Sequence, residues 1–298
     1  DTMVRRVPET LQRIRDVNPD YPQSIHDALK RLSDEIQSGA AIHMVEPHAP
    51  DFDHWLAQWQ PIKGDGWLNT GWFFAEVYLY RQIMTAIRWY ETERDPFIPI
   101  KNEEYAGDAL WRLLEKALSI QGDDIEERIT ALLHMDLWSN RIDLSFADSL
   151  KRGAENINAD DLLADDGVAM TRRLLDADGA VHFIVDNTGT ELALDLALAD
   201  ALIQNHTPVY LHLKWHPTFV SDATVSDVWN FIERCTQHGG DIAQFAGRLL
   251  AACETGSLRL APHPFWNSCY FLWEMPVHLT DLFKTARMVL VKGDANYR

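Results

Sequence analysis

Four residues that could carry chemistry follow short apolar segments in the second half of the chain: Asp186, Asn187, Asp222 and Lys292. Carboxylate and amide oxygens are the ligands that hard divalent cations such as magnesium and manganese prefer. A lysine ammonium can neutralise the oxygens of a phosphate group. These residue types therefore predict a metal- and phosphate-binding site.

Each of these residues also has an ordinary structural interpretation. Asp186 and Asn187 could cap the helix that follows them, because Asp and Asn are favoured at helix N-termini. Asp222 could cap a helix beginning near Thr224. Lys292 could be an exposed lysine at a strand end, although a buried ammonium would need a partner. The residue types alone leave both interpretations open.

Neighbouring residues extend the candidate site. Gly189 lets the backbone turn tightly before a helix whose N-terminus favours an anion. Glu191, at the start of that helix, could cap it or support the site. His216 and His263 could act as general acids, but a single histidine is more often structural.

Alternating strand and helix patterns in the second half place these residues on one edge of a sheet. We expect strands at 181–185, 209–213, 258–260 and 288–291, with helices at 191–203, 224–235, 242–252 and 279–286. Strands linked by helices pair in parallel and form a doubly wound sheet. Ligands of such sheets bind beyond the carboxyl ends of the strands, which is where the polar residues lie.

The first half has a helical pattern. Apolar residues recur every three to four positions, which predicts helices at 23–36, 72–89, 109–118 and 125–138. We therefore expect two domains, a helical N-terminal domain over 1–175 and an α/β domain over 176–298.

Composition excludes several classes of partner. The net charge of −18 disfavours nucleic acids and anionic membranes. No apolar run is long enough to span a membrane. The three cysteines, Cys235, Cys253 and Cys269, are odd in number and lack C-x-x-C spacing, which favours thiols in a reducing compartment and a cytoplasmic location. The oligomeric state is not predicted.

Motifs of other enzyme classes are missing from the sequence. We find no G-x-x-x-x-G-K-S/T loop, no G-x-G-x-x-G after a strand, no G-x-S-x-G and no H-E-x-x-H. P-loop nucleotide hydrolysis, nicotinamide chemistry, serine hydrolysis and zinc proteolysis are therefore disfavoured.

Six ordered blocks resemble the damage-control phosphatase family, in particular its sugar-phosphate phosphatase branch of acidic residue methyltransferase-like proteins. The blocks are VDNTGTELALDLALADALI (185–203), WHPTFVSDATVSDVWNFIE (215–233), HPFWNSCYFLWEMP (263–276), VKGDANYR (291–298), LWSNRIDLS (137–145) and WFFAEVYLYRQI (72–83). The resemblance implies a helical domain followed by a three-layer α/β/α domain with a mostly parallel, Rossmann-like sheet.

The resemblance also implies an activity. It implies a divalent cation, Mn²⁺, Mg²⁺ or similar, held by Asp186, Asn187 and Asp222. It implies metal-dependent hydrolysis of small phosphorylated metabolites, with hexose phosphates such as fructose 1-phosphate and fructose 6-phosphate as substrates. We expect substrate contacts from Asn187, Glu191, Lys292, Gly293, Asp294, Asn296 and Tyr297.

For catalysis we expect Asp186, Asp222 and Lys292 to act together. The nucleophile is either metal-activated water or the Asp186 carboxylate. Asp222 and Asp294 are candidates for handling protons.

Two alternative functions and one missing motif accompany this interpretation. An S-adenosylmethionine-dependent protein carboxyl methyltransferase lacks a recognisable Gly-rich methyl-donor loop here. A non-catalytic metabolite-binding module stays open because the related branch continues to an R-T-x-K motif, whereas this chain stops at Arg298. We expect the sequence to be truncated there.

Overall fold

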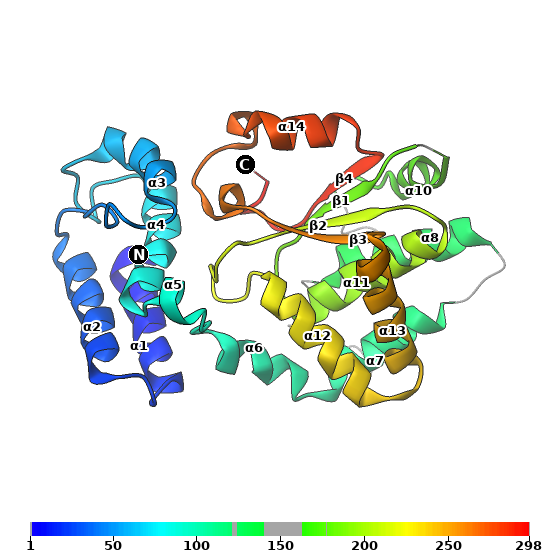
Figure 1. The fold of residues 1–298 in the computed structure, drawn as a ribbon, viewed down its shortest axis with the longest axis horizontal. Helices are drawn as coiled ribbons and strands as arrows, with labels where there is room; N and C mark the ends of the chain where they lie inside the picture. Colours follow the sequence, from blue (N-terminus) through cyan, green and yellow to red (C-terminus); the bar gives the residue numbers. More distant parts are fainter. Residues whose placement is uncertain (1, 121–123, 140–162, 177, 298) are drawn as a thin grey trace. The chain divides into compact units, whose positions relative to one another are not determined.

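The computed structural model describes residues 2–120, 124–139, 163–176 and 178–297 (Figure 1). The chain forms two compact units. The first contains Asp1–Asn102, Lys214–Asp222 and His263–Met275, and the second contains Glu103–Leu213, Ala223–Pro262 and Pro276–Arg298. These units differ from the division expected at residue 175, because helices from the first half pack with the sheet.

The first unit is built from helices. They are α1 (Val7–Val17), α2 (Gln23–Ser38), α3 (Phe52–Trp59), α4 (Trp72–Ala86) and α5 (Trp89–Thr92), and α6 (Ile98–Tyr105) runs from the first unit into the second. Helix α2 buries its apolar residues at three- to four-residue spacing, as predicted. The single helix predicted at 72–89 is wrong: α4 ends at Ala86, and Arg88 has a left-handed φ of 59° that breaks the helix.

A buried charge network stabilises the first unit. Arg81 is 1% exposed and donates from Nε and Nη2 to the carboxylate of Asp51. Asp51 also accepts hydrogen bonds from Trp55 Nε1 and from the hydroxyl of Tyr90, each at 2.9 Å. The carboxylate is thereby fully paired, which compensates for its removal from water.

Replacing Tyr90 with Phe is expected to lower the free energy of unfolding by about 1.5–3 kcal/mol, because a buried carboxylate loses one donor. Chemical denaturation would measure this change. The control is Tyr21→Phe, since the hydroxyl of Tyr21 is buried without a hydrogen-bond partner among the described residues. Equal effects of the two variants would contradict the prediction.

The second unit contains a four-stranded parallel sheet. Its strands are β1 (Val181–Ile184), β2 (Val209–Leu213), β3 (Leu258–Pro262) and β4 (Met288–Val291), in the order β3-β2-β1-β4. Val181 pairs with Val209 on one side and with Met288 on the other. All four strands were predicted from the sequence.

Helices cover both faces of this sheet (Figure 1). They are α7 (Asp108–Ser119), α8 (Ile125–Leu137), α10 (Gly167–Asp176), α11 (Thr190–Gln204), α12 (Val225–His238), α13 (Gly240–Thr255) and α14 (Val277–Lys284). On one face, Phe183 and Leu211 share the main core with α11. On the other face, Phe283 of α14 contacts the rings of His182 and His212. The three-layer, Rossmann-like α/β fold is thus confirmed.

The strand order creates a switch point between β1 and β4. The chain proceeds from β1 to β2 and β3, then crosses back through α14 to β4 on the other side of β1. The chain leaves β1 toward β2 and reaches β4 from β3, and doubly wound sheets bind ligands beyond the carboxyl ends of the strands at such a point. Asp186 and Lys292 follow these two strand ends.

His182 gives the second unit a pH-dependent stability. Burial lowers the pKa of His182 from 6.5 to about 4, so the unfolded chain binds more protons between these values. Stability is therefore expected to fall by up to about 3 kcal/mol as the pH is lowered from 6.5 to 4. Measured across this pH range, the free energy of unfolding should change less with pH in His182→Phe than in the wild-type chain. An unchanged profile would contradict the assignment to His182.

None of the described helices is long and apolar enough to cross a membrane.

Candidate functional site at the ends of strands β1 and β4

Asp186 and Asn296 link the adjacent strands β1 and β4 at their carboxyl ends. Asp186 is 8% exposed and Asn296 is 2% exposed. The Asn296 amide donates to the carbonyl oxygens of Val185 and Lys292, at 3.2 and 2.9 Å, and to the Asp186 carboxylate at 3.4 Å. The segment after β4 therefore fixes the loop that carries Asp186.

Gly293 makes room for the Asp186 carboxylate. Its φ is 77°, a left-handed conformation that favours glycine. A Cβ atom at this position would lie 2.2 Å from Cγ of Asp186. The carboxylate therefore lies directly against the backbone of Gly293. It occupies the space that a side chain at position 293 would need.

The amide of Asn187 has one possible orientation. Its nitrogen donates to Oδ2 of Asp186 at 2.8 Å and to Oε2 of Glu191 at 3.0 Å. Carboxylates only accept hydrogen bonds, so the nitrogen must face them and the amide oxygen must point away. Asp186 and Asn187 thus supply oxygens, the donor type that fits Mg²⁺ or Mn²⁺.

Lys292 lies among three carboxylates. Its ammonium donates to Oδ1 of Asp136 at 2.6 Å, to the Asp136 carbonyl oxygen at 3.3 Å and to Oδ1 of Asp195 at 3.0 Å. Glu191 Oε1 is 3.6 Å away. Three hydrogen bonds use the three protons of an ammonium, so all three donors of Lys292 are directed at groups of the protein.

The N-terminus of α11 already holds an anion, the carboxylate of Glu104. The backbone N–H of Thr190 donates to Glu104 at 2.6 Å, and the Thr190 hydroxyl bonds to the same oxygen. Tyr105 OH bonds to the Thr188 hydroxyl at 2.8 Å and accepts from the N–H of Gly189. Glu104 therefore supplies the capping that the sequence suggested for Asp186 and Asn187.

Asp222 lies in the first unit, 2% exposed, with buried lysines beside it. Lys214 Nζ is 3.3 Å from Oδ2 of Asp222, and Lys101 Nζ donates to the Asp222 carbonyl oxygen at 3.2 Å. The cap of α12 is Thr224, which forms a capping box with Asp227. Asp222 is therefore not the cap of that helix.

The remaining candidates are divided between surface and packing roles. Asp294 and Tyr297 are exposed, Tyr297 by 78%. His216 is buried and interacts with the backbone of Pro217 and the side chain of Asn267. His263 accepts a hydrogen bond from the N–H of Phe265 at the start of a short helix. These contacts give both histidines structural roles.

Sequence reasoning missed Asp136, Asp195 and Glu104. Asp195 had a detectable signal, because a carboxylate inside the apolar segment 191–203 needs a buried partner. It also lies one helical turn after Glu191, on the same face of α11. Asp136 and Glu104 come from distant helices, and their local sequence does not indicate the contact.

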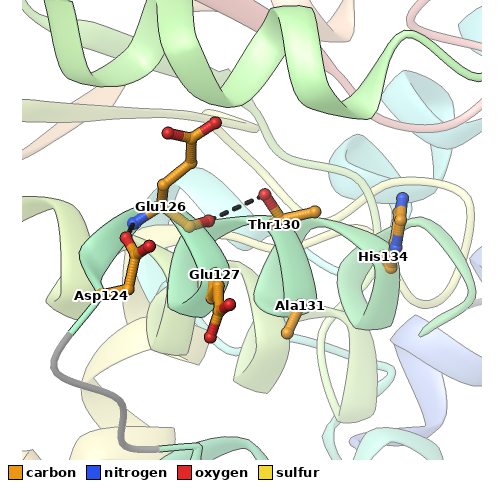
Figure 2. Close-up of a pocket in the computed structure, with 6 residues that line it drawn as sticks. All are labelled: Asp124, Glu126, Glu127, Thr130, Ala131 and His134. Atoms are coloured by element: carbon orange, nitrogen blue, oxygen red, sulfur yellow. Dashed lines mark hydrogen bonds between the residues drawn. The ribbon is translucent and has the colours of Figure 1, made fainter.

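A hollow beside α8 does not suit the same chemistry. It is lined by Asp124, Glu126, Glu127, Thr130, Ala131 and His134 (Figure 2). Asp124 caps α8 by accepting from the N–H of Glu126, and Figure 2 shows Glu126 and Glu127 pointing to different sides of the helix. Their carboxylates do not converge.

Within the described ranges, no group of three or more His, Cys, Asp or Glu side chains is arranged to hold a metal ion. The expected set of Asp186, Asn187 and Asp222 contains two carboxylates and one amide, so it is not a group of this kind.

Comparisons with known proteins give matches that cover the whole of this chain. A family model described as "Damage-control phosphatase ARMT1-like domain" matches residues 1–298. Damage-control phosphatase ARMT1 of Danio rerio is 26% identical over 345 residues, which cover 100% of this chain and 77% of the relative. The protein of the same name from Mus musculus is 28% identical over 336 residues, covering 100% and 76%.

A solved structure has a similar fold. A DUF89 family protein from Pyrococcus horikoshii gives a TM-score of 0.55 at 16% sequence identity, covering 99% of this chain and 84% of its own. At this identity the likeness concerns the fold alone.

Proposed function

Because the chain belongs to the damage-control phosphatase ARMT1-like domain family, we propose that it is a metal-dependent phosphatase of small phosphorylated metabolites. One observation carries the proposal. The Asp186 carboxylate and the oriented Asn187 amide lie at the switch point of the sheet, where the absence of a side chain at Gly293 makes room for the carboxylate. Parallel sheets bind ligands at this point.

Asp186, Asn187 and Asp222 are the proposed ligands of the divalent cation. A bound cation would supply positive charge to the phosphate oxygens as the ester bond breaks. Asp186 is held for this role by Asn296 and by the backbone of Gly293. The nucleophile is water or Asp186 itself, and Asp222 or Asp294 would accept or return a proton.

The segment after β4 is the proposed substrate-binding segment, with Gly293, Asp294, Asn296 and Tyr297. Exposed Asp294 and Tyr297 are accessible to a sugar, whereas buried Asn296 supports the segment from within. Direct neutralisation of phosphate by Lys292 stays a prediction, and its three internal hydrogen bonds favour an indirect role.

We propose hexose phosphates as substrates, with fructose 1-phosphate and fructose 6-phosphate first. This choice rests on the resemblance in the sequence blocks, because the names of the relatives state no substrate. A cytoplasmic location is proposed with it.

The test is phosphate release from a panel of sugar phosphates with Mn²⁺, Mg²⁺ or a chelator. We expect metal-dependent release from hexose phosphates, with little release in the chelator. Release that the chelator does not reduce would contradict metal dependence, and release from other phosphomonoesters alone would contradict the substrate class. Binding of metal and sugar phosphate without turnover would instead support a binding module.

A further inference from the structure

We propose that Asp136 and Asp195 are positioning residues of the metal site, which act by holding Lys292 against Glu191 so that the Asn187 amide keeps its oxygen directed at the cation. The inference rests on the proposed function. It concerns residues that do not themselves contact the cation or the substrate.

The first step is the anchoring of Lys292. Asp136 and Asp195 approach its ammonium from two different helices, α8 and α11, at 2.6 and 3.0 Å. Both carboxylates are buried, with 3% and 0% exposure. Since all three ammonium protons are donated to these two residues, the position of Nζ is fixed from two sides.

In the second step, the anchored Lys292 ammonium holds the carboxylate of Glu191 in place. Oε1 of Glu191 lies 3.6 Å from Lys292 Nζ, and its other oxygen, Oε2, accepts from the Asn187 amide at 3.0 Å. Glu191 is 4% exposed and thus bridges the ammonium and the amide within the protein. Without the lysine, this carboxylate would be a buried charge with a single amide partner, and its rotamer would be free to change.

The third step concerns the Asn187 amide. Its nitrogen is shared between Glu191 and Asp186. If Glu191 moves, one of these acceptors is lost and the amide can rotate, which turns its oxygen away from the cation. Residues that orient metal ligands typically change metal affinity by about 10–100-fold when they are replaced.

The charges of Lys292 and the carboxylates around it favour the same arrangement. Burial alone would lower the pKa of Lys292, but the carboxylates of Asp195, Asp136 and Glu191 outweigh it and raise the pKa above its usual value. Lys292 therefore stays charged. Burial, together with the Asp136 carboxylate, raises the pKa of Asp195 well above its ordinary range.

The experiment measures the Kd of Mn²⁺ by calorimetry, without substrate, for the wild-type chain and for Asp136→Ala and Asp195→Ala. We expect both variants to bind Mn²⁺ about 10–100-fold more weakly. At saturating Mn²⁺, kcat should recover while KM for fructose 1-phosphate stays unchanged. Asp136→Asn retains an acceptor for Lys292 and should bind Mn²⁺ more tightly than Asp136→Ala.

Asp200→Ala is the matched control. Asp200 lies on the same helix α11, is 2% exposed and pairs with Arg248 at 2.7 Å, but it does not contact Lys292. Its replacement should lower thermal stability and leave the Kd of Mn²⁺ within about two-fold of wild type.

The outcomes separate this inference from the proposed function. If the wild-type chain binds Mn²⁺ and the Asp136 and Asp195 variants bind it with the same Kd, the positioning role alone is overturned. An equal loss in Asp200→Ala would also overturn it, because a general loss of stability would then explain the data. A wild-type chain that binds no Mn²⁺ would overturn both proposals. If Asp195→Ala does not fold, the comparison of Asp136→Ala with Asp136→Asn decides.

Discussion

Replacing Asp186 with Ala is expected to reduce metal-dependent phosphate release by roughly 1,000-fold or more, because the site loses its central carboxylate. The side chain is 8% exposed at the end of β1 and accepts hydrogen bonds from Asn187 and Asn296. Steady-state release of phosphate from fructose 1-phosphate with Mn²⁺ would measure the loss.

The fold is expected to survive this change. Both amides that bond to Asp186 have other acceptors, Glu191 for Asn187 and backbone carbonyls for Asn296. Circular dichroism should therefore match wild type. The control is Asp178→Ala, an exposed carboxylate before the amino end of the same strand, which should stay fully active. Full activity of Asp186→Ala would refute its assignment.

Gly293→Ala is expected to reduce phosphate release by at least about 100-fold, although it adds one methyl group. The new Cβ would lie 2.2 Å from Cγ of Asp186, so the carboxylate or the segment after β4 must move. Displacements of about 1 Å in a catalytic site can cost this much activity. The loss should appear in kcat at saturating metal and substrate.

Backbone strain has to be separated from this steric effect. Gly240 also has a positive φ, 57°, but nothing lies within 4 Å of a Cβ built there. Gly240→Ala therefore reports strain alone and should leave activity unchanged. If both variants lose activity equally, contact with Asp186 is not the cause.

The sheet was predictable because local patterns determine it. Segments such as 181–184 and 209–213 are short, apolar and separated by helical patterns, so parallel pairing followed from topology rules. The same rules placed Asp186 and Lys292 at neighbouring strand ends, where the structure has them. The predicted helix at 72–89 failed because a left-handed residue, Arg88, breaks it without glycine or proline to signal the break.

The partners of the site residues were less predictable, because they depend on packing between distant segments. Lys292 was expected to face phosphate, yet its ammonium contacts Asp136, which is 156 residues away in sequence. Glu104 reaches the start of α11 from α6. Pattern rules describe one element at a time and cannot supply such contacts. The capping alternatives could be decided only when the caps themselves, Glu104 and Thr224, were seen.

The position of the cation tests the central claim most directly. Crystals of the chain grown with Mn²⁺ and measured at the manganese absorption edge would locate the ion by its anomalous scattering. We predict a manganese peak whose nearest protein atoms include carboxylate oxygen of Asp186 and the amide oxygen of Asn187. Manganese bound only at other residues, with none beside Asp186, would contradict the account.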